Sequence, residues 1–273
     1  MTAHRSTTGI KIVLTFIALV GLGLNFFIVL DADNGYFGVI KPRAAAAEPA
    51  DKPGVQPPPS KEVVAYAEVA KKSILLIYSE SCNDSSRANQ GTGFVIKSGY
   101  VATNAHVVKE AVDCGKQIFA KDSVGSAPYK LVLVGIPAGG SELNDIAILA
   151  FEDKSVSLPP LDLADSDDYT NGHMGDKVFT LGYGNINHIT PESPAMSGVG
   201  TLSQFDSTKN MFVTENMSLK PGNSGGPLLL ESDRKVLGLV YSRFNDFYIA
   251  ATSMIIPINH VKRFFREKTN VAL

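Results

Sequence analysis

A serine surrounded by glycines is the first candidate for chemistry in this sequence. Ser224 lies in the segment PGNSGGP, residues 221–227. Glycine lets a backbone turn tightly and approach a substrate closely, so a serine in this setting can act as a nucleophile. The same composition also suits an ordinary turn without any catalytic part. Because a serine nucleophile needs a base, residues elsewhere in the chain must decide between the two interpretations.

Two residues upstream have the types and surroundings that such a nucleophile needs. His106 follows an expected strand end in GYVATNAHVV, where the next residues are expected to make one turn of helix. An imidazole held there can take a proton from a serine hydroxyl near neutral pH. Asp145 opens NDIAILAF, where a carboxylate entering an apolar strand is costly to bury without a partner. An imidazole N–H would be that partner, although Asp145 taken alone also suits a loop cap beside Asn144. Together the three residues predict a triad of Ser224, His106 and Asp145.

Short β-strands are the elements that must position these side chains. From residue 74 onward, apolar runs alternate with clusters of Gly, Asn, Asp and Ser, between an expected helix at 61–72 and another at 257–268. Many short strands without long helices between them favour an all-β fold, as antiparallel barrels or a sandwich. The expected strands are 74–78, 93–97, 100–103, 130–135, 146–151, 177–182, 198–204, 211–215, 227–230, 236–242 and 248–256.

The N-terminal segment 12–30 is apolar and uncharged. As a helix it would reach about 28 Å, enough to span a bilayer core. Arg5 and Lys11 precede it, which favours a cytoplasmic N-terminus at residues 1–11 and places the rest of the chain outside. We therefore expect a single-pass membrane anchor with an extracytoplasmic domain. The alternative is a secreted protein, released by signal-peptide cleavage near Ala47.

Residues 31–60 are rich in Pro and Ala and have no apolar set to bury, so they are expected to be a linker to a domain at 61–273. The formal net charge is −2, with both signs mixed along the chain, which gives no reason to expect nucleic acid as a partner. Cys82 and Cys114 are the only cysteines and lack metal-ligand spacing, so neither a metal nor another cofactor is expected. They form either one disulfide or two unpaired thiols.

Several segments together resemble the HtrA (DegP-like) branch of the chymotrypsin-fold serine proteases. The resemblance covers about residues 62–266, and the order His, Asp, Ser is that of the chymotrypsin class. It implies two six-stranded antiparallel β-barrels, with a catalytic site between them and a C-terminal helix. The matching segments are GTGFVIKSGYVATNAHVV, NDIAILAFE, GDKVFTLGYG, SGVGTLSQF, TENMSLKPGNSGGPLL and VLGLVYS.

The resemblance also assigns roles around the triad. The N–H groups of Gly222 and Ser224 would form an oxyanion hole, and Ser218 and Tyr241 would contact substrate. Ser218 carries no charge, so small or medium apolar side chains are expected in the primary specificity pocket. Asn223 is neutral and cannot pair with a newly cut N-terminus, so we expect activity without such a cut.

For the protein as a whole, the resemblance implies polypeptide substrates, namely unfolded or damaged extracytoplasmic proteins, and makes a trimer possible. HtrA proteins commonly carry PDZ domains after the protease, and no such module fits after residue 266.

Two other functions compete with this one. Gly222 to Gly226 also satisfies G-x-S-x-G, with Asp246 and His260 following in the order of an α/β-hydrolase. That fold needs a helix directly after the serine, whereas Pro227 opens an expected strand. The second alternative is a protease-like module that binds peptides or proteins without cutting them.

Overall fold

The computed structural model describes two units of the chain, residues 1–53 and 54–273, which are considered separately. In the first unit, β1 (Phe27–Asp31) and β2 (Tyr36–Ile40) form an antiparallel pair. Residues 27–30 are thus in a strand and not in the membrane-spanning helix that the sequence predicts for 12–30, of which 12–26 lie outside the described residues. No helix in the described part of the chain is long and apolar enough to cross a bilayer. The described residues are 27–31 and 36–40, for their backbone, and 58–82, 88–125, 127–165, 174–185, 190–217, 219–241 and 252–273.

The second unit begins with a helix and a closed barrel. Helix α1 (Lys61–Ala70) is capped by the Ser60 hydroxyl, which accepts from the N–H of Val63, and leads through the turn η1 (Lys71–Ser73) into the first strand. The barrel closes in the order β3-β4-β5-β8-β7-β6, with all neighbours antiparallel. Its strands are β3 (Ile74–Glu80), β4 (Ala88–Lys97), β5 (Tyr100–Thr103), β6 (Ile118–Lys121), β7 (Tyr129–Gly135) and β8 (Ala147–Phe151).

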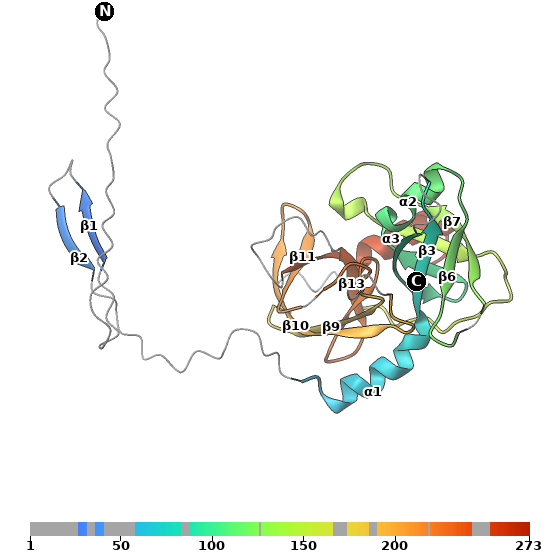
Figure 1. Ribbon diagram of the computed structural model, residues 1–273, viewed down its shortest axis with the longest axis horizontal. Coiled ribbons are helices and arrows are strands. Elements are labelled where there is room, and N and C mark those ends of the chain that lie inside the picture. Colours follow the sequence, from blue (N-terminus) through green and yellow to red (C-terminus); the bar gives the residue numbers. More distant parts are fainter. Residues whose placement is uncertain are drawn as a thin grey trace, which may run out of the picture. The chain divides into compact units, whose positions relative to one another are not determined.

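A second closed barrel follows, in the order β10-β11-β14-β13-β12-β9, and is again antiparallel (Figure 1). The predicted pair of six-stranded barrels with a C-terminal helix is therefore confirmed. The strands are β9 (Lys177–Gly182), β10 (Ala195–Asp206), β11 (Met211–Glu215), β12 (Pro227–Leu230), β13 (Val236–Tyr241) and β14 (Ser253–Pro257), followed by helix α3 (Ile258–Thr269).

Apolar packing joins the two barrels. Each barrel has its own core, and a third cluster contains buried residues from both, among them Phe94 and Phe179. Helix α3 contacts β13, β14 and also β7 of the first barrel. The Phe265 ring lies 5.0 Å from that of Tyr100, edge to face. Burial of this apolar surface holds the barrels in a fixed relation, which any site between them requires.

Two elements of the first barrel differ from the prediction. The helix after β5, α2 (Ala105–Asp113), runs for nine residues instead of a single turn, because Val107, Val108 and Ala111 all pack into the barrel core. Strand β6 was not among the expected strands. A four-residue strand in a polar stretch gives little periodicity, and here its flanking strands β3 and β7 supply the pairing.

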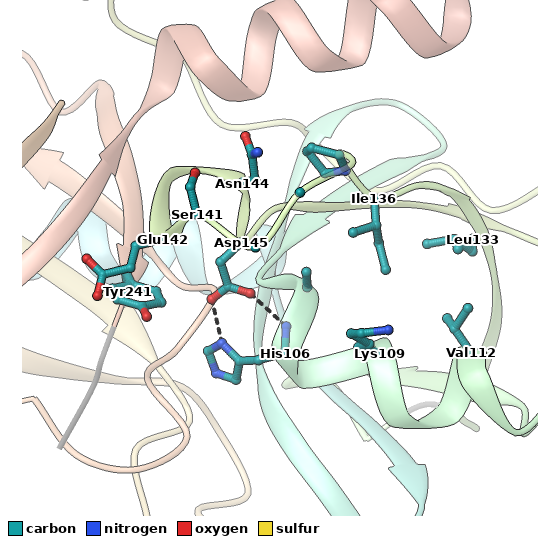
Figure 2. A pocket seen from close by; sticks show the side chains of 14 residues that line it. His106, Lys109, Val112, Leu133, Ile136, Ser141, Glu142, Asn144, Asp145 and Tyr241 are labelled. Carbon is teal, nitrogen blue, oxygen red and sulfur yellow. Dashed lines mark hydrogen bonds and ion pairs between the residues drawn. The ribbon is translucent and has the colours of Figure 1, made fainter. Parts of the chain in front are cut away.

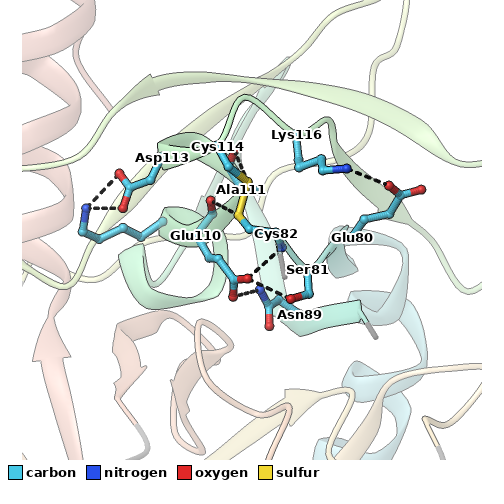
Figure 3. The surroundings of a disulfide bond; sticks show 10 residues. Glu80, Ser81, Cys82, Asn89, Glu110, Ala111, Asp113, Cys114 and Lys116 are labelled. Atoms are coloured by element: carbon cyan, nitrogen blue, oxygen red, sulfur yellow. Dashed lines mark hydrogen bonds and ion pairs between the residues drawn. A yellow bond between two sulfur atoms is a disulfide. The ribbon is translucent and has the colours of Figure 1, made fainter. Parts of the chain in front are cut away.

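A disulfide joins β3 to α2 (Figure 3). Cys82 lies just beyond β3 and Cys114 is the C-cap of α2. Beside the disulfide, the Glu110 carboxylate accepts hydrogen bonds from Asn89, the Cys82 N–H and the Ser81 hydroxyl, and these bonds lower the pKa of Glu110. The helix that begins beside His106 is thus tied to the end of β3 by a covalent bond and by a carboxylate.

Candidate active site

His106 and Asp145 form a two-point pair in the first barrel. Asp145 Oδ2 lies 2.6 Å from His106 Nδ1, and its Oδ1 accepts a 2.8 Å hydrogen bond from the His106 backbone N–H (Figure 2). In a neutral imidazole, this contact with a carboxylate places the ring proton on Nδ1 and the lone pair on Nε2. The pair therefore fixes both the start of α2 and the tautomer that a general base needs.

Local structure explains why these two side chains meet. Asn104, the N-cap of α2, donates from its side chain to the Asp145 carbonyl at 2.8 Å. Asp145 itself ends the short turn η2 (Glu142–Asn144) directly before β8, which pairs with β5. The two strands thereby bring the helix start and the turn to the same end of the barrel. The Asp145 side chain is 13% exposed and that of His106 46%, so the carboxylate is shielded while the ring reaches solvent.

A cavity of about 620 Å³ opens beside this pair. Tyr241 forms part of its wall, with its ring 6.4 Å from the His106 ring and nearly perpendicular to it. Tyr241 is the last residue of β13, so the wall includes a residue of the second barrel. The lining comprises Ala105, His106, Lys109, Val112, Leu133, Ile136, Pro137, Gly139, Gly140, Ser141, Glu142, Asn144, Asp145 and Tyr241. A partly apolar cavity beside a base has the character of a binding site.

Ser224 lies in a tight turn that leads into β12 of the second barrel. Gly222 has φ +96° and Gly225 has φ +84°, conformations that strongly favour glycine. A Cβ on Gly222 would lie 2.4 Å from the Tyr183 carbonyl oxygen, so the turn also has no room for a side chain there. The strand that follows Ser224 is incompatible with the α/β-hydrolase alternative, which needs a helix at this point.

The Ser224 turn packs against the segment that carries His106. A Cβ on Gly225 would lie 2.3 Å from Thr103 Oγ1 and 2.9 Å from the Asn104 nitrogen, immediately before α2. Within the described residues, no hydrogen bond joins Ser224 Oγ to the His106 ring. Such a bond often forms only when a substrate binds. The close approach of Gly225 to Thr103 and Asn104 shows that the Ser224 turn and the segment before His106 adjoin.

Two backbone N–H groups of the turn have no acceptor among the residues that the structure describes: those of Gly222 and Ser224. The N–H groups between and after them are used, since Asn223 donates to the Lys220 carbonyl and Gly225 to the Val240 carbonyl. The turn thus presents two unpaired donors close to the serine. The two N–H groups are therefore available to donate to a molecule bound beside the serine.

The remaining predicted residues have separate positions. Ser218 and Asp246 lie outside the described residues. His260 lies on α3, where its ring nitrogens have Asn210 and Arg263 as partners, and burial together with the Arg263 charge lowers its pKa to about 4. Across the described ranges, no three His, Cys, Asp or Glu side chains gather as a metal site would require. No sequence signal singled out Thr92, which contacts the Ser224 turn from β4.

Comparison with known proteins finds a peptidase domain in this chain. The family model described as trypsin-like peptidase domain matches residues 91–239. The serine protease Do-like HtrA of Bacillus subtilis (strain 168) is 27% identical over 221 residues, which are 76% of this chain and 46% of that protein. A probable periplasmic serine endoprotease DegP-like of Halomonas elongata is 31% identical over 179 residues, 63% of this chain and 34% of that protein. The chain spans less than half the length of these relatives.

Solved structures share the two-barrel fold. The serine endoprotease from Yersinia pestis superimposes with a TM-score of 0.58 at 22% identity, over 79% of this chain and 68% of that one. The inactive form of Rv3671c from M. tuberculosis gives 0.54 at 21% identity, over 80% and 97%. Since the family model covers more than half of the chain, and HtrA and DegP-like proteins are among its relatives, this protein belongs to the family of trypsin-like peptidase domains.

Proposed function

We propose that this protein is a serine endopeptidase that uses Ser224 as nucleophile, His106 as general base and Asp145 as the orienting carboxylate. The observation that carries the proposal is the two-point contact of Asp145 with His106, because it leaves Nε2 as the proton acceptor next to the segment that packs on the Ser224 turn. A structural histidine would not need a carboxylate on both its ring and its backbone.

The mechanism follows from these positions. His106 Nε2 takes the proton of the Ser224 hydroxyl as its oxygen attacks the peptide carbonyl, and Asp145 stabilises the imidazolium that forms. The imidazolium then gives its proton to the leaving amine, and an acyl-enzyme remains. Water, activated by the same ring, attacks the acyl group and releases Ser224. The partial exposure of His106 leaves its ring accessible to substrate and water.

The unpaired N–H groups of Gly222 and Ser224 would bind the oxyanion of each tetrahedral intermediate. One such donor is typically worth about 10²- to 10³-fold in rate, because it is already oriented when negative charge develops. Asn223 makes a local contact, in which its side-chain oxygen accepts from the Lys220 N–H at 2.8 Å. This neutral contact, available within one chain, supports activity without N-terminal cleavage.

The relatives and the cysteines support a proposal for the substrates and the location of the protein. We infer that the substrates are unfolded or damaged proteins outside the cytoplasm, and that the primary pocket at Ser218 accepts small or medium apolar side chains. The disulfide between Cys82 and Cys114 supports an oxidising compartment. Attachment to a membrane through the apolar segment 12–30 is also proposed; it rests on the hydropathy of that segment, of which residues 27–30 belong to strand β1.

A fluorophosphonate probe tests the proposed chemistry on the full-length chain. The intact protein should be labelled and should cleave an unfolded protein substrate such as casein, whereas Ser224→Ala should do neither. His106→Ala should reduce labelling strongly, while Ser203→Ala, a serine of β10 whose hydroxyl donates to the Val213 carbonyl, serves as the matched control and should label normally. Equal absence of labelling in wild type and Ser224→Ala would support the non-catalytic binding module instead. Labelling that begins only after an N-terminal cut would contradict activity of the uncleaved chain.

A further inference from the structure

Thr92 lies in β4 of the first barrel and is fully buried, and its hydroxyl and backbone N–H contact the second barrel. Its hydroxyl donates to the Gly222 carbonyl at 2.6 Å and accepts from the Tyr183 N–H at 2.9 Å. Its backbone N–H donates to the Ser224 carbonyl at 2.8 Å, and its carbonyl accepts from the Thr103 hydroxyl at 2.7 Å. Both donors of Thr92 are used, and two of its hydrogen bonds go to the Ser224 turn.

These bonds bear on the two unpaired N–H groups of the turn. In a trans peptide the N–H points opposite to the carbonyl of the preceding residue, so holding that carbonyl orients the N–H. The Pro221 carbonyl accepts from the Asn185 N–H at 2.7 Å, which orients the N–H of Gly222. The Asn223 carbonyl accepts from the Gly226 N–H at 2.9 Å, which orients the N–H of Ser224.

The peptide between these two is that of Gly222 and Asn223, and its carbonyl is the one that the Thr92 hydroxyl holds. The N–H of this peptide donates to the Lys220 carbonyl within the same turn, and Gly222, at φ +96°, has many other accessible conformations. The Thr92 hydroxyl is the restraint that reaches this peptide from outside the turn. Rotation there would change the angle between the two N–H groups without unfolding either barrel. The Thr92 hydroxyl is a strong restraint, because removing it leaves two backbone groups, the Gly222 carbonyl and the Tyr183 N–H, without this partner.

We propose that Thr92 is a positioning residue for catalysis: its hydroxyl, reaching across from the first barrel, fixes the relative direction of the Gly222 and Ser224 N–H groups so that both can bind one oxyanion. This inference rests on the proposed peptidase function. It assigns to Thr92 an effect on the transition state rather than on the binding of substrate in its ground state.

The test compares Thr92→Val with Thr92→Ser in the full-length chain, using a chromogenic peptide and counting active sites by fluorophosphonate titration. Valine has nearly the same shape but no hydroxyl, so kcat per active site should fall about 10- to 100-fold with KM nearly unchanged. Serine keeps the hydroxyl and should retain kcat within about threefold of wild type. If Thr92→Val does not fold, Thr92→Ala, which leaves room for a water at the Gly222 carbonyl, should still show a reduced kcat.

Thr180→Val is the matched control. Thr180 is also fully buried, in β9, and its hydroxyl donates to the Pro227 carbonyl at 2.7 Å, just after the nucleophile turn. The Thr180→Val variant should lower the thermal midpoint as Thr92→Val does, yet leave kcat near wild type. If the wild type is active and Thr92→Val and Thr180→Val have equal kcat, the positioning role of Thr92 is overturned and the proposed peptidase function is not. An inactive, unlabelled wild type would instead overturn the proposed function.

Discussion

The two barrels hold their parts of the candidate active site by different means. In the first barrel, His106 and Asp145 are positioned by side-chain hydrogen bonds, with the carboxylate contacting both the ring and the helix start. In the second barrel, Ser224 is positioned by the shape of its backbone, through two glycines with positive φ and carbonyls bonded to neighbouring strands.

The difference has a physical basis. A general base must keep one tautomer and still exchange protons, so a partly exposed ring with one shielded carboxylate suits it. Oxyanion binding requires N–H groups that are rigid before the reaction begins, and backbone geometry supplies this without mobile side chains. We therefore expect the first barrel to respond to changes of charge and hydrogen bonding, and the second to changes of backbone conformation.

The largest effect should come from Asp145→Asn, which alters the hydrogen bonding of His106, while the side chain at position 145 keeps its size. The amide can donate to Nδ1 and so favour the wrong tautomer of His106, and kcat should fall by about 10⁴-fold. Circular dichroism and the thermal midpoint should stay close to wild type, since the side chain keeps its shape. A decrease of less than tenfold in steady-state kcat would contradict the role of Asp145.

A smaller but still large effect is expected for Gly222→Ala in the second barrel. The added Cβ would meet the Tyr183 carbonyl at 2.4 Å in a backbone conformation at φ +96°, so the turn must shift. Loss of one oxyanion donor should lower kcat by about 10²- to 10³-fold. Gly99→Ala provides a control: this glycine also has positive φ, at +84°, but a Cβ there meets nothing within 4 Å, so it should cost stability and not kcat.

The disulfide tests how firmly the first barrel holds His106. Replacing both Cys82 and Cys114 by Ser should lower the free energy of unfolding by about 2–4 kcal/mol, because the unfolded chain regains the freedom of a 32-residue loop. Glu110 still ties α2 to the end of β3, so kcat should change by less than about threefold. Urea denaturation measures the first quantity and peptide hydrolysis the second. A stability equal to wild type would show that the bond contributes nothing to the fold.

The smallest effect concerns His260, which lies on α3 and does not line the cavity of the candidate active site. Its pKa falls from 6.5 to about 4 on folding, so between these values the unfolded chain binds more protons than the folded one. Stability should therefore decrease as the pH falls from 6.5 towards 4, and His260→Gln should flatten that part of the profile. Thermal midpoints at half-unit pH steps provide the measurement, and parallel profiles for the two proteins would contradict the assignment.

Much of the framework could be predicted because its signals are local. The expected strands 100–103, 177–182, 211–215 and 227–230 coincide with β5, β9, β11 and β12, whose apolar runs are bounded by turn residues. The segments carrying His106, Asp145 and Ser224 adjoin such strands, so they could be found by residue type and spacing alone.

Other features depend on contacts between distant parts of the chain. Thr92 binds Gly222 across 130 positions of sequence, and a threonine in a run of small residues carries no sign of this. Strand β6 exists because β3 and β7 flank it, and α2 extends beyond one turn because the barrel core receives its apolar face. Local pattern cannot report such partners, since they depend on the assembled fold.

The position of α3 bears on when the candidate active site can form during synthesis. Phe265 packs on Tyr100, and the Ala272 carbonyl accepts from Lys97, so the first barrel obtains part of its packing from residues that are synthesised after both barrels. A nascent chain would carry the three candidate catalytic residues before residues 258–269 have emerged. We therefore expect the spacing of the two barrels to become fixed only after α3 has been synthesised.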